Sequence, residues 1–475
     1  MSKLLLFILI PISNSLLTAN SIAADQPNIV FIYTDDQAPT AVGFAGNKEL
    51  KTPNIDRIAS EGIQIPNAFT VTPVCSPSRA SLVTSRYACE LGILDWINPK
   101  SETELGLNPN TVTWMELLQQ AGYRTALSGK WHLGTADRYH PTLQGYDEFM
   151  GIRDGGCPPK DPVLEIDGHN VKTSGFTVDL VTEHALEFIK KNKDKPFLSS
   201  IHYREPHSAW LPTRDEDWAP YKDLDPTLPG PVHPDLNVAL VKKRTREYYA
   251  SVASVDRNVG RVLDLLDELK IAENTIVVFT SDHGYHNGHH ALWFKGNAHW
   301  VLNELPPQQY KNIARLRRPN MFDQALKVPT AIRWPAGLKG GRTVPQTMSN
   351  LDWYPTLLSM AGIELADDLT IRGRDFTPML KGLRIAWNND LYAEYSMRHG
   401  AKTDMRCWRT PEWKLMIDFA NKGRGELYDL KNDPGELKDL YESQDPQHVE
   451  IRKELKSKIL NRIKEINDPL IVNLD

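Results

Sequence analysis

The residues of this chain best suited to chemistry are Cys75 and the four that follow it, Ser76-Pro77-Ser78-Arg79. A helix is predicted just after them, at residues 80–84, and the proline presets the turn that leads into it. A helix N-terminus directs backbone N–H groups and partial positive charge towards the thiol, and Arg79 adds a permanent cation. These features favour an activated nucleophile that attacks an anionic substrate. A buried structural thiol is the competing interpretation.

Acidic residues follow two segments that are predicted to be strands. Asp35 and Asp36 come soon after the apolar run at residues 28–33, and Asp282 comes soon after the run at residues 275–280. Open parallel sheets place their ligands at the carboxyl ends of the strands, so these carboxylates are expected at one edge. Adjacent aspartates repel one another unless a cation lies between them, and hard oxygen donors suit Ca²⁺. A solvated turn is the alternative for Asp35 and Asp36.

A lysine and two histidines follow further predicted strands. Gly129-Lys130-Trp131-His132 comes after residues 123–128, and His207 comes after residues 197–202. A lysine at the edge of the sheet would offset the charge of an anionic substrate, and a histidine would transfer protons. Taken singly, each histidine is better explained by a neutral structural role and the lysine by surface solvation.

Strands and helices alternate along most of the chain, and each cluster of polar residues follows a strand. This order predicts an α/β fold with a doubly wound, mostly parallel sheet and its site along one edge. Later in the chain, short strands at 391–397, 405–409, 413–417 and 426–429 precede a charged helix at 447–466. We therefore expect a catalytic domain at 25–385 and a smaller C-terminal α+β subdomain at 386–475, made of an antiparallel sheet and one helix.

Four blocks of the sequence, residues 28–36, 75–79, 129–134 and 280–284, carry these candidate residues in a fixed order. In that order they resemble the motifs of the type I, formylglycine-dependent sulfatases, and in particular of bacterial polysaccharide sulfatases. The resemblance covers nearly the whole mature chain. It implies an alkaline-phosphatase-like fold and the hydrolysis of sulfate esters.

The resemblance also implies that residue 75 is modified. In this family the motif cysteine is converted to formylglycine by a formylglycine-generating or equivalent maturation enzyme, and the aldehyde is hydrated to a diol in water. One diol hydroxyl would attack the sulfur, and loss of sulfate from the resulting hemiacetal would re-form the aldehyde. His207, helped by Lys295, would be the acid of the first step, and His132 the base of the second.

Site residues are implied in the same way. The catalytic set is Cys75, Arg79, Lys130, His132, His207 and Lys295. The ligands of one Ca²⁺ are Asp35, Asp36, the modified Cys75, Asp282 and His283. Many relatives have asparagine where this chain has His283, which weakens that assignment. The substrate-binding set is Lys130, His207, Lys295, Arg398, His399 and Arg406.

The expected substrate is a sulfated polysaccharide or its oligosaccharides, carrageenan-like or glycosaminoglycan-like, because tryptophans in predicted loops would stack on sugar rings. A phosphonate or phosphodiester hydrolase of the same superfamily is the enzymatic alternative. If Cys75 were not converted, the chain would be a non-catalytic binder of sulfated glycans. The basic stretch that contains Arg315, Arg317 and Arg318 is interpreted as a solvated face.

Composition and the first residues bear on partners and compartment. The chain has 475 residues and a net charge of −5, with no basic run of the kind that binds nucleic acid. A basic start, an apolar run at residues 4–12 and small residues after it predict a cleaved signal peptide at 1–24. The apolar run is too short to anchor the chain in a membrane. We therefore expect a periplasmic or secreted protein.

Cysteine usage is sparse, with four in the whole chain. If Cys75 is modified, an odd number remains. One disulfide at most is expected among Cys89, Cys157 and Cys407, and the sequence does not choose the pair.

Overall fold

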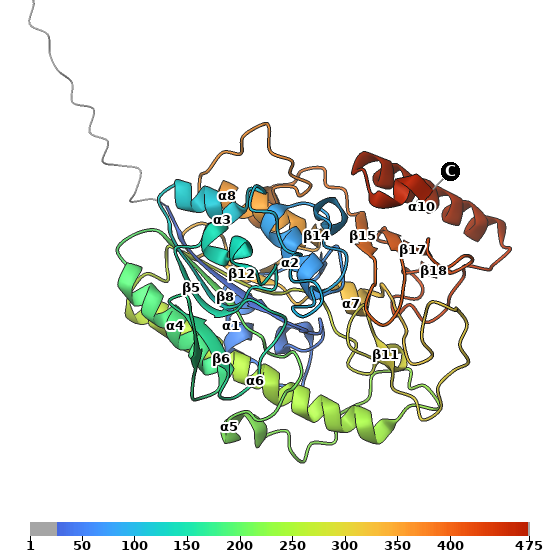
Figure 1. The fold of residues 1–475 in the computed structure, drawn as a ribbon, viewed down its shortest axis with the longest axis horizontal. Coiled ribbons are helices and arrows are strands. Elements are labelled where there is room, and N and C mark those ends of the chain that lie inside the picture. Colours follow the sequence, from blue (N-terminus) through green and yellow to red (C-terminus); the bar gives the residue numbers. More distant parts are fainter. Residues whose placement is uncertain (1–25, 474–475) are drawn as a thin grey trace, which may run out of the picture.

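A computed structural model describes residues 26–473, and the predicted signal peptide at 1–24 lies outside them. Its main feature is a ten-stranded sheet with the order β13-β2-β12-β9-β1-β8-β4-β5-β6-β7 (Figure 1). The parallel central strands are β9 (Thr275–Ser281), β1 (Asn28–Thr34), β8 (Phe197–His202), β4 (Arg124–Lys130) and β5 (Glu148–Ile152). The prediction of a mostly parallel sheet is confirmed.

Shorter strands extend the sheet on both sides of this parallel centre. On one side β12 (Ala331–Arg333) is antiparallel to β9 and to β2 (Ile63–Gln64), and β13 (Arg342–Thr343) runs parallel to β2. On the other side β6 (Val163–Ile166) and β7 (His169–Lys172) form an antiparallel hairpin beside β5. The strand ends that carry the candidate residues therefore lie in the middle of the sheet.

Helices cover both faces of the sheet, and the central strands are therefore buried on both sides. Val30 and Ile32 of β1 share a core with α1 (Pro53–Glu61), α4 (Thr177–Asn192) and α6 (Val238–Glu268). Ile29 and Phe31 point the other way, into a core shared with α2 (Cys75–Thr84), α3 (Trp114–Gln120) and α8 (Trp353–Met360). The two layers are visible in Figure 1, and they confirm the doubly wound arrangement.

The C-terminal part forms the predicted subdomain at the right of Figure 1. Its antiparallel strands are β15 (Leu391–Tyr395), β16 (Met405–Arg409), β17 (Trp413–Asp418) and β18 (Gly425–Asp429), and α10 (Pro446–Glu465) packs on β16 and β17. Glu394 joins it to the catalytic part. Its backbone N–H donates to Val71 O at 2.8 Å, and its carboxylate accepts the N–H of Cys89 at 2.8 Å.

Some local boundaries differ from the prediction. α2 begins at Cys75 rather than at residue 80, because a proline is tolerated in the first turn of a helix. α6 begins at Val238, because the Asn237 side chain caps it by accepting the N–H of Leu240 at 3.0 Å. The remaining short strands and helices are β3 (Ala68–Phe69), β10 (Leu292–Trp293), β11 (His299–Trp300), β14 (Met348–Ser349), α5 (Asp215–Trp218), α7 (Asp323–Leu326) and α9 (Thr377–Leu380).

All four cysteines carry free thiols. Within residues 26–473 we find no helix with the length and apolar character needed to cross a membrane.

The structure overturns the substrate-binding assignment of Arg406. This β16 residue is only 1% exposed, and its guanidinium forms a fork with Asp468, with Nε 2.6 Å from Oδ2 and Nη2 2.9 Å from Oδ1. A third donor, Nη1, bonds the Ser396 hydroxyl at 3.1 Å. Arg406 therefore holds the C-terminal chain against the subdomain sheet, and its burial keeps it out of reach of a substrate.

Replacing Arg406 with methionine should destabilise the protein by about 3–5 kcal/mol, because Asp468 would be left as a buried, unpaired charge. Urea unfolding followed by fluorescence measures this loss. The exposed Arg384→Met is the control, and it should change the unfolding free energy by less than about 0.5 kcal/mol. Equal stability of the two variants would contradict the structural role of Arg406.

Candidate active site

Helix α2 brings Cys75 to the carboxyl ends of β1 and β9. Cys75 is the first helical residue, and its side chain is buried. Ser78, one turn later, donates its hydroxyl to the backbone carbonyl of Asp282 and lies 2.8 Å from the Thr70 hydroxyl. Asn350 donates to the Ser78 carbonyl at 3.1 Å. The start of the helix is thus tied to the end of β9.

Three carboxylates converge beside this helix start. Thr34 lies opposite Ser281 in the register of β1 and β9, so Asp35 and Asp282 leave the sheet side by side. The N–H of Asp36 donates to Asp282 Oδ1 at 3.3 Å. All three carboxylates are fully buried. The structure therefore brings together the acids that the strand pattern placed at one edge of the sheet.

Lys130 and Arg79 balance two of these carboxylates. Lys130 is the last residue of β4, and its ammonium pairs with Asp35. Arg79 Nη2 lies 3.3 Å from Asp35 Oδ2 and 3.0 Å from Asp282 Oδ2. Its Nη1 donates to the Lys130 carbonyl at 3.0 Å. Both cations are held in place by the chain and are shielded from water.

Lys295 connects the third carboxylate to the thiol. Its Nζ lies 2.7 Å from Asp36 Oδ1 and 3.2 Å from Cys75 Sγ. The backbone carbonyl of Lys295 accepts the side-chain N–H of Asn320 at 3.0 Å. The segment that carries Lys295 is thereby fixed beside the nucleophile, at the place that the resemblance implied.

The three cations do not compensate the three carboxylates fully. Burial raises the pKa of Asp35, but Lys130 and Lys295 outweigh it and hold that pKa well below its usual range. Burial raises the pKa of Asp36 well above its usual range, although Lys295 opposes the shift. Burial also raises the pKa of Asp282. A further positive charge would allow all three carboxylates to ionise.

The donor atoms around this cluster fit a divalent cation. Asp35, Cys75, Asp282 and His283 each offer one ligand atom, and these atoms all lie within 4.8 Å of one another. Asp35 Oδ1 and Asp36 Oδ2 are buried without a hydrogen-bond donor. Cys75 Sγ marks the place of the oxygens that formylglycine would present. Buried, unbonded carboxylate oxygens are what a hard cation such as Ca²⁺ or Mg²⁺ requires.

His283 is oriented as a ligand would be. Its Nδ1 lies 3.0 Å from the Gly284 carbonyl, which can only accept, so Nδ1 carries the proton. The Nε2 lone pair then faces the carboxylates, 3.2 Å from Asp282 Oδ1 and 3.9 Å from Asp35 Oδ1. Burial lowers the pKa of His283, which favours the neutral ring that binds metals.

His132 and His207 flank the cluster, and they carry their protons on different ring nitrogens. His132 Nε2 donates to the Ile97 carbonyl at 3.1 Å, so its Nδ1 is a buried, unbonded lone pair. His207 Nδ1 donates to the Ser208 carbonyl at 2.7 Å, and its Nε2 lies 3.8 Å from Asp36 Oδ2. Burial holds the pKa of both histidines well below the usual value. The side chain of His207 is 25% exposed, so it lies on the path from solvent to the cluster.

The thiol of Cys75 differs from the other three. Burial raises the pKa of a thiol, but Lys130 and Lys295 outweigh it and lower the pKa of Cys75 to about 7. Burial raises the pKa of Cys157 and that of Cys407 to about 12. Only the motif cysteine therefore lies in an electropositive environment.

Arg398 and His399 lie on the loop that follows β15, and each already has a partner. Arg398 Nη2 lies 2.6 Å from Asp404 Oδ1, so its charge is compensated within the loop. The His399 ring packs at a tilt of 44° against Trp96, with ring centroids 4.4 Å apart, and its Nε2 lies 3.1 Å from Glu102. With these partners, neither Arg398 nor His399 offers an uncompensated positive charge to the carboxylate cluster.

Sequence reasoning missed several residues that position the site. Asp95 accepts the backbone N–H groups of Arg398 at 2.7 Å and His399 at 3.0 Å, and Asn350 anchors Ser78. These residues do not follow predicted strands and belong to no motif, so no local signal marks them.

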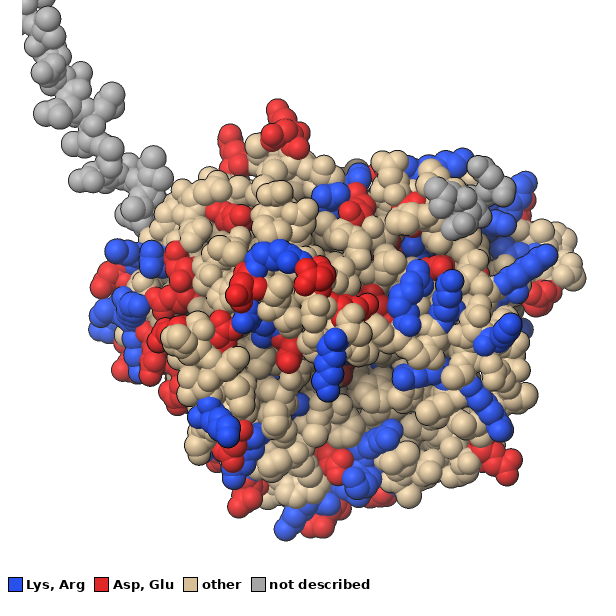
Figure 2. All heavy atoms as spheres, in the orientation of Figure 1, with Lys and Arg blue, Asp and Glu red and all other residues tan. Residues whose placement is uncertain are grey.

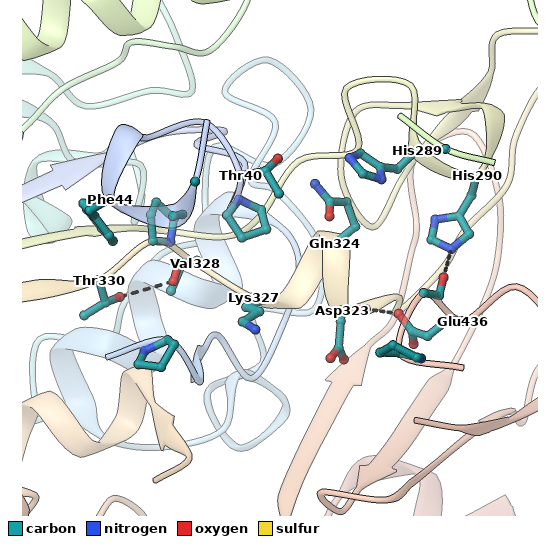
Figure 3. Close-up of a pocket in the computed structure, with 18 of the residues that line it drawn as sticks. Thr40, Phe44, His289, His290, Asp323, Gln324, Lys327, Val328, Thr330 and Glu436 are labelled. Carbon is teal, nitrogen blue, oxygen red and sulfur yellow. Dashed lines mark hydrogen bonds between the residues drawn. The ribbon is translucent and has the colours of Figure 1, made fainter. Parts of the chain in front are cut away.

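A large surface cavity is separate from this cluster. It has a volume of about 700 Å³ and is lined by residues from the loop after β1, from α7 and the following loop, and from the turn at 434–437 (Figure 3). Lys327 lies in its middle, with Thr40 and Gln324 above it in the figure. None of the cluster residues lines this cavity.

Comparison with known proteins identifies the class of this site. The sulfatase family model matches residues 27–363, and the model for the C-terminal region of N-sulphoglucosamine sulphohydrolase matches residues 316–465. The chain therefore belongs to the sulfatase family, as its motifs predicted, and is a sulfuric ester hydrolase.

Relatives and solved structures agree with this assignment. The N-acetylglucosamine-6-O-sulfatase of Bacteroides thetaiotaomicron is 28% identical over 501 residues, which cover 88% of this chain and 83% of that protein. The ulvan-active sulfatase of Formosa agariphila is 32% identical over 369 residues, or 75% of this chain and 65% of that one. A structure solved with its substrate D-glucosamine-2-N,6-O-disulfate has a TM-score of 0.79 at 25% identity, covering 93% of this chain and 98% of that chain. The alkaline-phosphatase-like fold is thereby confirmed.

Calcium should stabilise the wild-type protein after treatment with a chelator, because only the folded chain brings the ligands together. At 100 times its Kd, one bound ion adds about 2.7 kcal/mol to the unfolding free energy. Calorimetry with and without added Ca²⁺ measures the shift in Tm. Asp282→Asn should lose the shift, whereas Asp367→Asn, an exposed control, should keep it. A shift that survives in Asp282→Asn would contradict the metal site.

Proposed function

We propose that this sulfatase hydrolyses sulfate monoesters on a sulfated polysaccharide or oligosaccharide and releases inorganic sulfate. The observation that carries the proposal is the contact of Lys295 Nζ with Cys75 Sγ at 3.2 Å, at the edge of the buried carboxylate cluster. It places a cation where the sulfate of a substrate would meet the nucleophile. The proposed cofactors are formylglycine, formed from Cys75 by a maturation enzyme, and one Ca²⁺ held by Asp35, Asp36, Asp282 and His283.

The charges of the cluster favour an anionic substrate once a divalent cation is bound. The three cations, Arg79, Lys130 and Lys295, formally cancel the three aspartates. A divalent ion then leaves a net charge of +2 among buried side chains, where electrostatic attraction is stronger than in bulk water. A sulfate monoester carries one negative charge and would be drawn in, and the same charges would stabilise the extra charge of its transition state.

Different side chains serve as the acid and the base in the proposed reaction. Formylglycine, when present, supplies a hydroxyl as the nucleophile at residue 75. Burial lowers the pKa of Lys295, but Asp36 and Cys75 outweigh it and raise that pKa, so Lys295 holds a proton beside the reacting atoms. The exposed edge of His207 is where the leaving alcohol would depart. An anionic ester bound beside the His207 ring would favour the protonated imidazolium over the neutral ring, so His207 and Lys295 are the proposed proton donors. His132, with its unbonded Nδ1, is the proposed base for sulfate release.

A carbohydrate substrate is supported by the relatives and by the surface. The relatives reported above are a hexosamine sulfatase and an ulvan-active sulfatase by name. A further structure, 26% identical with a TM-score of 0.71, was solved with k-i-k-neocarrahexaose. In Figure 2 the side over the C-terminal subdomain shows more Lys and Arg than Asp and Glu, as suits a polyanionic glycan. We also propose that the enzyme works in the periplasm or outside the cell, where such polymers are found.

Matured protein should be lighter than the sequence mass by about 18 Da, the difference that converts a cysteine to formylglycine. Intact-mass spectrometry measures it. Cys75→Ala should keep its full sequence mass and release no sulfate from a sulfated oligosaccharide, because no nucleophile can form. Cys89→Ala is the control, and it should show the mass loss and turn over. A Cys75→Ala protein with full activity would rule out this nucleophile.

Sulfate and phosphate esters of the same sugar alcohol separate the proposal from a phosphodiester or phosphonate hydrolase. The sulfate ester should have the higher kcat/KM by at least about 100-fold, or about 2.7 kcal/mol of transition-state stabilisation. A preference for the phosphate ester would favour the alternative. Binding of both esters without turnover, by protein whose Cys75 is unconverted, would indicate a glycan binder.

A further inference from the structure

Arg317 is a half-buried cation that has no ion pair among the described residues, although the charge of Asp95 reaches it. Of its two arginine neighbours, Arg318 pairs with Glu426 at 2.8 Å, and Arg315 is exposed and donates to the Pro306 carbonyl at 2.8 Å. Arg317 makes only neutral contacts: Nη1 donates to the Asn297 carbonyl at 3.3 Å and meets the His299 ring. Within the described part of the chain its guanidinium forms no ion pair. An unpaired charge held away from water is costly unless a ligand compensates it.

Backbone contacts pair the segment that carries Arg317 with the segment that carries Lys295. His299 bridges to Arg317 in antiparallel fashion, and Lys295 lies four residues earlier. Four extended residues span at most about 14 Å. Asn320 locks the two segments together, because its N–H donates to the Gly296 carbonyl at 2.9 Å and its side chain donates to the Lys295 carbonyl. Arg317 is therefore fixed relative to Lys295.

The loop of the C-terminal subdomain approaches Arg317 from the other side. A Cβ added at Gly400 would lie 3.1 Å from Arg317 Nη2, so the loop backbone packs closely against the guanidinium. Tyr395 belongs to the same subdomain: it shares a core with Cys75, and its hydroxyl bonds Asp95 at 3.2 Å. Burial and Asp95 raise the pKa of Tyr395, and the charges of Cys75 and Arg317 both reach it.

We propose that Arg317 binds a second anionic substituent, a carboxylate or a sulfate, on the same sugar chain whose sulfate ester lies at Cys75. The inference rests on the proposed function and narrows its substrate to glycans that carry two anionic groups. A planar guanidinium binds carboxylate or sulfate oxygens in pairs, which a lysine does less well. The Trp96 ring, which packs at a tilt against His399 beside Gly400, supplies an apolar surface for the sugar between the two groups.

Three substrates of one sugar scaffold test this assignment: one with a single sulfate, one with a second sulfate, and one with a uronate beside the sulfated unit. Arg317→Met should lower kcat/KM by about 10- to 150-fold on a doubly anionic substrate, the worth of a charge-assisted hydrogen bond. On the singly sulfated sugar it should change less than about twofold. If kcat/KM falls on the substrate with two sulfates, the second group is a sulfate. If it falls on the substrate with the uronate, the second group is a carboxylate. Arg317→Lys should recover part of the loss, because the charge remains.

Lys327→Met is the matched control, since Lys327 is also half-buried and without an ion pair but lines the separate cavity of Figure 3. It should leave the ratio of the kcat/KM values unchanged. An equal loss on all substrates, or no loss, in Arg317→Met would overturn the assignment. If Arg317→Met does not fold, the wild-type protein provides the test. The assignment requires that wild type have a higher kcat/KM at low salt on a doubly anionic substrate than on the singly sulfated sugar. If wild type cleaves no sulfate ester at all, the proposed function fails instead.

Discussion

The site depends on the charge balance of a buried cluster. Three aspartates at the ends of β1 and β9 are removed from water, which is costly for ionised carboxylates unless cations lie beside them. Lys130 and Arg79 supply compensation for Asp35, and Lys295 supplies it for Asp36. Because the pKa values of Asp36 and Asp282 are still raised, the balance is incomplete. The remaining deficit of positive charge suits a divalent ion.

The fold makes this concentration of charge possible. A parallel sheet covered by helices on both faces forms a rigid floor, and its strand ends present groups from distant parts of the sequence side by side. Asp35 and Asp282 are 247 residues apart in the chain yet meet through the register of two adjacent strands. Helix α2 then adds Cys75 and Arg79 from one short segment. The packed core keeps these groups in place before any substrate arrives, which is what electrostatic catalysis requires.

The fold class and most residues of the cluster could be predicted from the sequence. The cluster residues follow apolar strands, and the sequence pattern predicts those strands. Asp35, Lys130 and Asp282 all belong to this group, and the fold class follows from the same pattern. The roles of Arg406 and Arg317 could not be predicted. The partner of Arg406, Asp468, is 62 residues away. Arg317 stands in a basic stretch that resembles a solvated face, and only the packing of Gly400 and His299 around it shows that it is half-buried.

Family membership establishes the reaction class. The geometry of this chain explains how the buried aspartates, lysines and arginine compensate one another's charge. The central claim is that the cluster holds a divalent cation beside residue 75. Anomalous X-ray diffraction from crystals of the matured protein grown with Ca²⁺ tests it most directly. The account predicts one ion among Asp35, Asp36, Asp282 and His283, with oxygen ligands at about 2.3–2.6 Å and Lys295 turned from Asp36 towards residue 75. A map with no ion, in which Lys295 stays paired with Asp36, would contradict it.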